Sequence, residues 1–358
     1  MEASRQNKIA DAQSFYTSMI SVVYVMVLTG IISPHLSIKV LEEEGLLWVS
    51  LLTLGFMVAR STASLIHAPL YRKYSARLIG GLGLSMLITS YYLYSILPPL
   101  YYPVLQMLTG FSSGLFWPLM QSLLAHGLSP SWRSRGFSLY FIVGAIASYA
   151  GYQIGSLIYV FLGPQYIFVT AYISGLAYLA LFLRIAPRQK LNVKVSRYSL
   201  ELRTGFRELG GLVPLTFLVG GVNGLLKDYL IAYTKLITGY SEPVIRNMWS
   251  IAGYIGLALS YLASYIQEKM HMEKQVLVTG TSMLLLLLLL LPSRNPYTVF
   301  TIIALAITGS RMLRPVIRGI ATNRTREPET AIAIINSLSN VSAALTPFVL
   351  ALLSSIVI

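Results

Sequence analysis

Long apolar runs recur along almost the whole chain, and they constrain its fold more than any other feature. A run of about 20 apolar residues can span a bilayer as a helix, because a helix satisfies its own backbone hydrogen bonds. The predicted spans are about 13–37, 46–70, 78–97, 101–127, 136–162, 165–185, 212–238, 245–267, 275–292, 296–320 and 330–358. With 55% hydrophobic residues and a mean hydropathy of +0.66, we expect an all-α polytopic membrane protein.

The charge pattern predicts how the chain is oriented in its membrane. Most of the lysines and arginines behind the formal charge of +14 lie in alternate loops. Such loops are cytoplasmic under the positive-inside rule, so the charge does not indicate nucleic acid. The polar start, Met1 to Gln13, is no cleavable signal peptide. We expect an integral protein of the plasma membrane, with a cytoplasmic N-terminus and, after eleven spans, an extracellular C-terminus.

The longest polar stretch, 186–211, divides the predicted spans into six before it and five after it. We therefore expect an N-terminal six-helix bundle over 1–185, a basic cytoplasmic linker over 186–211 and a C-terminal five-helix bundle over 212–358. Within the linker, Leu202, Phe206 and Leu209 have helical spacing. They predict an amphipathic helix on the inner membrane surface, with a disordered linker as the alternative.

The two halves of the chain resemble each other at a fixed offset. Gly83–Leu87 matches Gly280–Leu284, and 280 − 83 = 197. Pro118 and Pro315 have the same separation, 315 − 118 = 197. Matches at equivalent places in successive spans predict two repeats of the same orientation, related by an axis along the membrane normal.

The repeat also predicts that the second half lacks the counterpart of the sixth span. Adding 197 to 165–185 gives 362–382, which lies beyond Ile358. We therefore expect one flank of the second half to be open to membrane lipid, a partner subunit or a separately encoded helix.

Short motifs in the loops carry a resemblance to a known family. The stretch Ala68–Arg77 keeps a leucine and two cations of that family's loop signature, Lys73 and Arg77, although Arg72 stands where the signature has an acid. The equivalent loop of the second half has the acid–base pair Glu268 and Lys269. In addition, Gly110–Pro118 and Arg135–Gly136 look like the family's fourth helix and the loop after it.

With its two halves and basic linker, the chain resembles the major facilitator superfamily of secondary transporters. The resemblance implies a cavity between the halves that opens alternately to each side of the membrane. It also implies gating roles for the loop residues Lys73, Arg77, Arg135, Glu268 and Lys269.

Charged residues near the middle of the spans are candidates for substrate binding. A charge there costs about 2.5–3.5 kcal/mol on insertion scales, so each one needs a reason. The candidates are Arg60, Lys227, Asp228 and Arg311, joined by Arg314 on the face of Arg311, by Gln121 as the counterpart of Arg318, and by Asn223.

Several of these candidates have structural alternatives. Arg314 could instead extend to the inner surface. Lys227 and Asp228 are adjacent, so they should point about 100° apart on a helix, and Asp228 could pair with Arg246. Gly220, Gly221, Asn223 and Gly224 make a break in this helix plausible, and such breaks expose backbone groups at substrate sites.

Signals for catalysis, metals and cofactors are weak. The string Gly110–Gly114 matches a nucleophile elbow, but it lies inside an apolar run without a preceding strand. The four histidines have no metal-ligand spacing, and the chain has no cysteine. We therefore expect no enzyme, no cofactor and no metal.

The sequence thus predicts a secondary transporter that moves a small molecule by alternating access. Arg60, Lys227 and Arg311 outnumber the single carboxylate, Asp228, which favours an organic anion or a phosphorylated metabolite. Coupling to a proton or counter-ion stays open. The alternatives are a proton-coupled exporter of neutral or cationic drugs, and a non-transporting receptor or scaffold.

Overall fold

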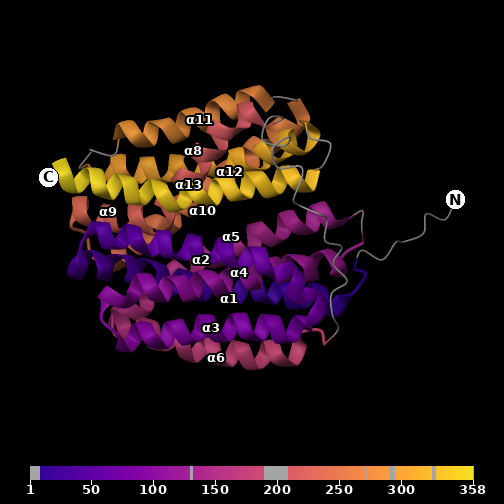
Figure 1. Cartoon of the computed structure of the whole chain (residues 1–358). Coiled ribbons are helices and arrows are strands. Elements are labelled where there is room, and N and C mark those ends of the chain that lie inside the picture. Colours follow the sequence, from indigo (N-terminus) through magenta and orange to yellow (C-terminus); the bar gives the residue numbers. More distant parts are fainter. Residues whose placement is uncertain are drawn as a thin grey trace. The chain divides into compact units, whose positions relative to one another are not determined.

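The computed structural model describes residues 9–129, 132–188, 209–270, 273–290, 295–324 and 328–357, which are helical almost throughout (Figure 1). The first half contains α1 (Ala12–Glu44), α2 (Leu46–Lys73), α3 (Ala76–Ile96), α4 (Tyr102–Gly127), α5 (Arg133–Phe161) and α6 (Tyr166–Ile185). The second contains α8 (Val213–Gly224), the π-helical turn η4 (Leu225–Tyr229), α9 (Leu230–Thr238), α10 (Glu242–Met270), α11 (Glu273–Leu290), α12 (Pro296–Arg324) and α13 (Pro328–Val357). Since α8, η4 and α9 form one continuous helix, the predicted arrangement of six plus five helices is confirmed.

Most of these helices could cross a membrane. Within the described ranges, eight helical segments are long and apolar enough to do so. The other three long helices are α4, α10 and α11, of which α11 has a shorter apolar segment, Lys274–Leu287. Length and composition therefore support an integral membrane protein.

Tight turns join several neighbouring helices, and glycine makes them feasible. Gly45, between α1 and α2, has φ 87°, and Gly163, between α5 and α6, has φ 105°. Gly239 ends α9 with φ 66°. These left-handed conformations are strained for residues with a side chain, so glycine is required where the chain reverses direction between helices.

The chain folds as two compact units, each described here as far as its residues are placed. The first consists of Met1–Ile32, Ala59–Pro98 and Val104–Val195, and the second of Ser33–Val58, Pro99–Pro103 and Ser196–Ile358. The end of α1 and the start of α2 therefore pack with the helices of the second half. The linker boundaries 186–211 stay a prediction, and its expected amphipathic helix falls mostly on 189–208, outside the described residues. Leu209 is described, and it is buried.

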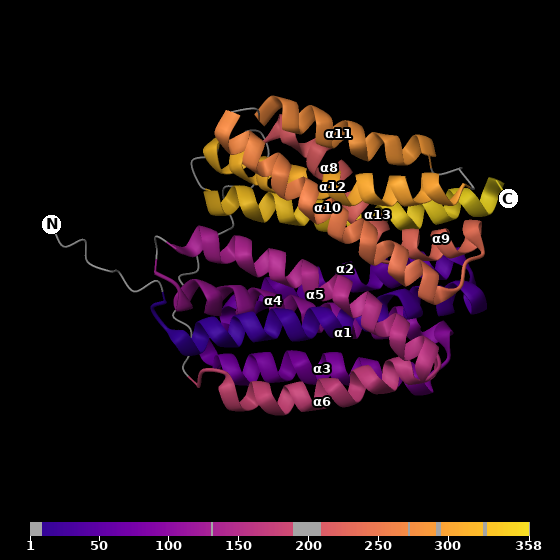
Figure 2. The ribbon, with the colours of Figure 1, turned by 180° about the vertical axis from the view of Figure 1, so that it is seen from behind.

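In the first unit, α3 packs along α6, and the two run side by side in both views (Figures 1 and 2). The helices α1 and α5 approach closely where Gly30 meets Gly151. A Cβ added to Gly151 would lie 2.3 Å from the carbonyl oxygen of Val27. Because backbone atoms cannot move aside as a flexible side chain can, only glycine fits at this crossing.

In the second unit, α8 packs along α13, and α12 packs against both α10 and α11. The α8–α13 contact again depends on glycine. A Cβ added to Gly220 would lie 2.5 Å from the carbonyl oxygen of Ser339, and one added to Gly224 would lie 2.1 Å from that of Ala343. Small residues thus bring two helices together here, as they do between α1 and α5.

Equivalent contacts inside the two units support the internal repeat. In the first unit, Ser112 of α4 donates a hydrogen bond to the carbonyl oxygen of Gly83 in α3, at 2.6 Å. In the second, a Cβ added to Gly309 of α12 would lie 2.8 Å from the carbonyl oxygen of Gly280 in α11. Each residue of the second contact lies 197 positions after its equivalent in the first, since 280 − 83 = 197 and 309 − 112 = 197. The offset read from the sequence therefore also relates contacts in space.

Candidate substrate and gating site

A fully buried carboxylate, Asp228, organises the first polar cluster of the second unit. Its Oδ2 accepts hydrogen bonds from Lys227 Nζ at 2.6 Å and from Thr53 Oγ1 at 2.7 Å. Its Oδ1 accepts one from Ser37 Oγ at 3.1 Å. Ser37 lies on α1 and Thr53 on α2, and both are buried. We call these four residues the Asp228 cluster. A buried carboxylate is costly unless it is paired and hydrogen-bonded, and these donors meet both conditions.

Lys227 is the member of this cluster that keeps some access to its surroundings. Its side chain is 21% exposed, whereas that of Asp228 is 0% exposed. The ammonium group lies 4.3 Å from the centroid of the Phe56 ring, where a cation–π attraction adds to the ion pair. In addition, Ser33 Oγ lies 3.4 Å from the carbonyl oxygen of Lys227. Lys227 is therefore oriented by α1 and α2 as well as by its neighbour.

The sequence did not predict this pairing, and the reason is the shape of the helix. The two side chains were expected to point about 100° apart, and the structure nevertheless pairs Lys227 Nζ with the carboxylate of Asp228. Both lie in the π-helical turn η4, whose wider coil and the long lysine side chain let Nζ reach the neighbouring carboxylate. The helix also does not break at Gly220–Gly224. The irregularity begins at the next residue, Leu225, and π-helical turns of this kind are frequent at functional sites.

A second buried polar cluster links α1 to α10. His35 Nδ1 lies 2.8 Å from Glu242 Oε2. Arg246 Nε donates a hydrogen bond to Glu242 Oε1 at 2.7 Å, and Arg246 Nη2 lies 2.6 Å from the same oxygen. Arg246 is 0% exposed and Glu242 is 4% exposed. We call these three residues the Glu242 cluster. The expected alternative of an Asp228–Arg246 pair is wrong, because Arg246 pairs with Glu242.

Neither Glu242 nor His35 was among the predicted site residues. One signal was present, since Glu242 and Arg246 are four residues apart, a spacing that pairs opposite charges on a helix. Nothing in the sequence indicated that His35 would join them from 207 residues away. A third ion pair, Lys235 to Glu42 at 3.2 Å, is more exposed, so it adds less to stability.

Asn223 links two helices of the second unit. Its Nδ2 donates to the carbonyl oxygen of Val219 at 2.6 Å, and its Oδ1 accepts a hydrogen bond from Ser310 Oγ at 2.7 Å. Arg311, the next residue of α12, is half-buried, and Arg314 is exposed. The candidates Asn223, Lys227, Asp228, Arg311 and Arg314 all lie in this unit.

The other two substrate candidates belong to the first unit. Arg60 on α2 and Gln121 on α4 are both half-buried. The backbone of Arg60 also forms a tight helix crossing, because a Cβ added to Gly114 would lie 2.5 Å from the carbonyl oxygen of Arg60. Gly114 is the last residue of the string that matched a nucleophile elbow. Its small size serves the packing of α2 against α4.

Among the predicted gating residues, Arg77 has the best-defined contacts. Its guanidinium donates to the carbonyl oxygen of Ala186 from Nε at 3.1 Å and from Nη2 at 2.7 Å, and Nη2 lies 3.3 Å from that of Arg184. It therefore caps the C-terminus of α6, where a cation is favoured. Lys73 is exposed, 5.4 Å from the ring centroid of its neighbour Tyr74.

The remaining gating candidates lie at helix ends. Arg135, near the start of α5, is exposed and lies 5.0 Å from the ring centroid of Trp132. Glu268 and Lys269 lie in the last turn of α10, and their side chains are outside the described part of the structure. Within the described residues, no three histidine or acidic side chains gather as a metal site.

Comparisons with known proteins agree on one fold. The sequence profile of the Major Facilitator Superfamily matches residues 12–347. No curated protein sequence matches the chain. Similar solved structures include a bacterial homologue of the human lysosomal transporter Spinster, with a TM-score of 0.71 and 12% identity over 96% of this chain and 82% of that one.

Two further structures are similar over comparable lengths. The nucleoside transporter NupG has a TM-score of 0.73 and 12% identity, over 94% of this chain and 90% of its own. A D-xylose-proton symporter has a TM-score of 0.68 and 12% identity, also over 94% and 90%. Similarity at this level of identity shows the fold alone.

Proposed function

Because the chain belongs to the Major Facilitator Superfamily, we propose that it transports an organic anion or a phosphorylated metabolite. The family and the fold make it a secondary transporter in a membrane, which moves small molecules by alternating access. What we propose is the chemical class of the cargo, and we infer it from the charged residues within the spans.

One observation carries the proposal: Asp228, the carboxylate within the spans, is already paired with the ammonium group of Lys227. Asp228 is the only acidic residue within the predicted spans. Its carboxylate oxygens accept hydrogen bonds from Lys227, Ser37 and Thr53. Three cations near the middle of the spans against one carboxylate leave roughly +2 in a low dielectric, where charge is costly. An anionic substrate would offset that charge, whereas a cationic one would add to it.

Lys227 and Arg311 are the cations of the second unit that we expect to contact the substrate. Lys227 is partly exposed and held in place by Asp228 and Phe56. Arg311 is half-buried, and a guanidinium binds a carboxylate or phosphate through two parallel hydrogen bonds. Arg60 is the corresponding candidate of the first unit. We expect an incoming anion to compete with Asp228 for Lys227.

The similar structures leave the type of cargo open. They include a nucleoside transporter, a D-xylose-proton symporter and a peptide transporter. Such different molecules move through one fold, so the cargo depends on local side chains. We also propose that the protein lies in the plasma membrane with its N-terminus on the cytoplasmic side, because the basic loops favour that orientation.

A binding screen on purified protein tests the proposal. Carboxylates and phosphate esters should raise the melting temperature more than neutral sugars or lipophilic cations do. Arg311→Gln should reduce this effect, and so should Arg60→Gln. Arg318→Gln is the matched control on α12, because Arg318 is exposed and donates to Asn336 at 3.1 Å. If a neutral or cationic compound is bound and carried equally well by both arginine variants, the proposal is wrong.

A second candidate, a proton-coupled carrier of neutral or cationic compounds, is favoured by the burial of Asp228. Asp228 is the one acidic residue within the predicted spans, and carboxylates at membrane depth are typical of proton relays in transporters. Counterflow in proteoliposomes separates the two candidates. Uptake of a neutral or cationic compound that follows an imposed pH gradient, and loses this dependence in Asp228→Asn, would support the second one.

A further inference from the structure

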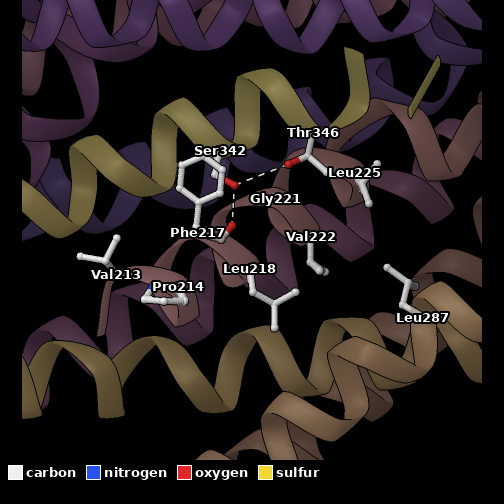
Figure 3. A pocket seen from close by; sticks show the side chains of 10 residues that line it. All are labelled: Val213, Pro214, Phe217, Leu218, Gly221, Val222, Leu225, Leu287, Ser342 and Thr346. Atoms are coloured by element: carbon white, nitrogen blue, oxygen red, sulfur yellow. Dashed lines mark hydrogen bonds between the residues drawn. The ribbon is translucent and has the colours of Figure 1, made fainter. Parts of the chain in front are cut away.

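An apolar groove lies on the second unit. It lies between α8, α11 and α13, and its volume is about 450 Å³. Figure 3 shows its walls, which include Phe217, Leu218 and Gly221 of α8, Leu287 of α11, and Ser342 and Thr346 of α13. The groove lies entirely within one compact unit.

The polar groups of the groove already have partners. Ser342 Oγ donates to the carbonyl oxygen of Phe217. Thr346 Oγ1 lies 3.5 Å from Ser342 Oγ and can donate to it (Figure 3). The hydroxyls of Ser342 and Thr346 are hydrogen-bonded to the backbone and to each other. A ligand of the groove therefore needs no charged or hydrogen-bonding group. Its complement is an apolar surface.

The internal repeat shows what occupies the equivalent place in the first unit. There α6 contacts α1 at Gln13, whose Nε2 donates to the carbonyl oxygen of Ile185, and at three residues farther along α1. Thr17 Oγ1 donates to the carbonyl oxygen of Ile185 at 3.2 Å, Ser21 accepts a hydrogen bond from Tyr178 at 2.6 Å, and Tyr24 stacks on Tyr178 with ring centroids 4.5 Å apart.

Adding 197 to those three α1 positions leads into the groove. The results are 17 + 197 = 214, 21 + 197 = 218 and 24 + 197 = 221, and Pro214, Leu218 and Gly221 all line it. If the true offset between the two repeats differed from 197 by one helical turn, the equivalent positions on α8 would still lie on this face. The face of α8 that corresponds to the α6-binding face of α1 is therefore a wall of the groove.

The exposure of α3 and α11 shows the same difference. Positions 81–90 and their equivalents 278–287 agree in burial except at four places: 81, 84, 85 and 88 are each less exposed than 278, 281, 282 and 285. Those places share one face of a helix. Ile88, which packs on Gly175 of α6, is 3% exposed, while its equivalent Leu285 is 47% exposed.

We propose that this groove seats one apolar transmembrane helix of a second polypeptide. The first unit fills the equivalent place with a helix, and the groove lies between the equivalents of the helices that α6 contacts, α1, α3 and α5. The buried side chains of α6 recur every three or four residues and include Phe168, Tyr178 and Phe182. The partner helix should present large side chains at the same spacing, because Gly221 stands where the first unit has Tyr24.

Photo-crosslinking in native membranes tests this inference. A benzophenone side chain introduced at Leu285 should yield an adduct larger than the 39.6 kDa chain, and its added peptide should be an apolar segment of about 20 residues. The matched control is Ile173 on α6, which is 60% exposed on a helix that already fills its own place. A benzophenone there should react with lipid only.

A second variant shows whether the adduct depends on the groove. Leu218→Trp should fill it and abolish the adduct at Leu285, whereas Ile173→Trp should leave that adduct unchanged. Both proteins should keep the melting temperature of the parent. Lipid adducts alone at Leu285, an adduct with the mass of two copies of this chain, or an adduct that persists in Leu218→Trp would each overturn the proposal.

Discussion

Replacing Asp228 by asparagine should destabilise the second unit mainly by leaving Lys227 without its carboxylate. Asparagine has nearly the same shape, so little packing is lost. Removing one partner of a buried ion pair costs about 3–5 kcal/mol. Lys227 is 21% exposed, so solvent can partly compensate, and the lower end of the range, about 3 kcal/mol, is expected.

The hydroxyl donors around Asp228 should each contribute less. Thr53→Val removes one hydrogen bond to a charged group, for which about 1.5–3 kcal/mol is typical. Ser37→Ala should cost less than Thr53→Val, because Ser37 Oγ also lies 3.0 Å from the carbonyl oxygen of Ser33 and divides its single proton between two acceptors. The expected order of destabilisation is therefore Asp228→Asn, then Thr53→Val, then Ser37→Ala.

A double-mutant cycle separates the ion pair from general damage. Lys227→Met keeps a long side chain against Phe56 and removes the charge. Combined with Asp228→Asn, it should restore about 2 kcal/mol relative to Asp228→Asn alone, since no unpaired lysine is then left in the low-dielectric interior. Unfolding in mixed micelles, followed by tryptophan fluorescence, gives the free energies. If the effects of the two substitutions simply add, Lys227 and Asp228 do not stabilise the fold as a pair.

Three further substitutions test other contacts in the same assay. Glu242→Gln should cost about 3–5 kcal/mol, because it leaves the fully buried Arg246 without a carboxylate, and a loss below about 1 kcal/mol would contradict that role. Gly151→Val should prevent the α1–α5 contact and abolish folded protein, whereas Gly210→Ala, with open space around its Cβ position, should be nearly neutral. Arg77→Gln should cost about 1–3 kcal/mol by uncapping α6, and binding of the cargo by the folded variant should not change.

Sequence alone predicted the helices well, because each span depends on local hydropathy. All eleven expected spans correspond to long helices, and the offset of 197 between Gly83 and Gly280 reappears as an equivalent contact in space. Hydropathy and repeats are properties of short segments, so they can be read without knowing which helices touch. The site depends on contacts between distant segments, and there the sequence predicted less.

The Asp228 cluster shows why. Lys227 and Asp228 were identified from their depth in a span, but the partners Ser37 and Thr53 are 191 and 175 residues away. A serine or threonine in an apolar helix usually bonds to its own backbone, as Thr29 does to Val25. Nothing local distinguishes the few hydroxyls that reach another helix. The π-helical turn was also unpredictable from an ideal helix of 3.6 residues per turn.

The two buried clusters impose a constraint on the transport cycle. Both join the segment 33–58 to helices of the second half, through Ser37 and Thr53 in one case and His35 in the other. Any movement that separates this segment from η4 and α10 must leave Asp228 with Lys227 as its remaining partner. An anion that binds Lys227 would then weaken the last contact of a buried carboxylate. Anion binding should therefore be favoured while Ser37 and Thr53 still donate to Asp228, and separation should be favoured when no anion is bound. Occupancy of the proposed site would then be coupled to conformation.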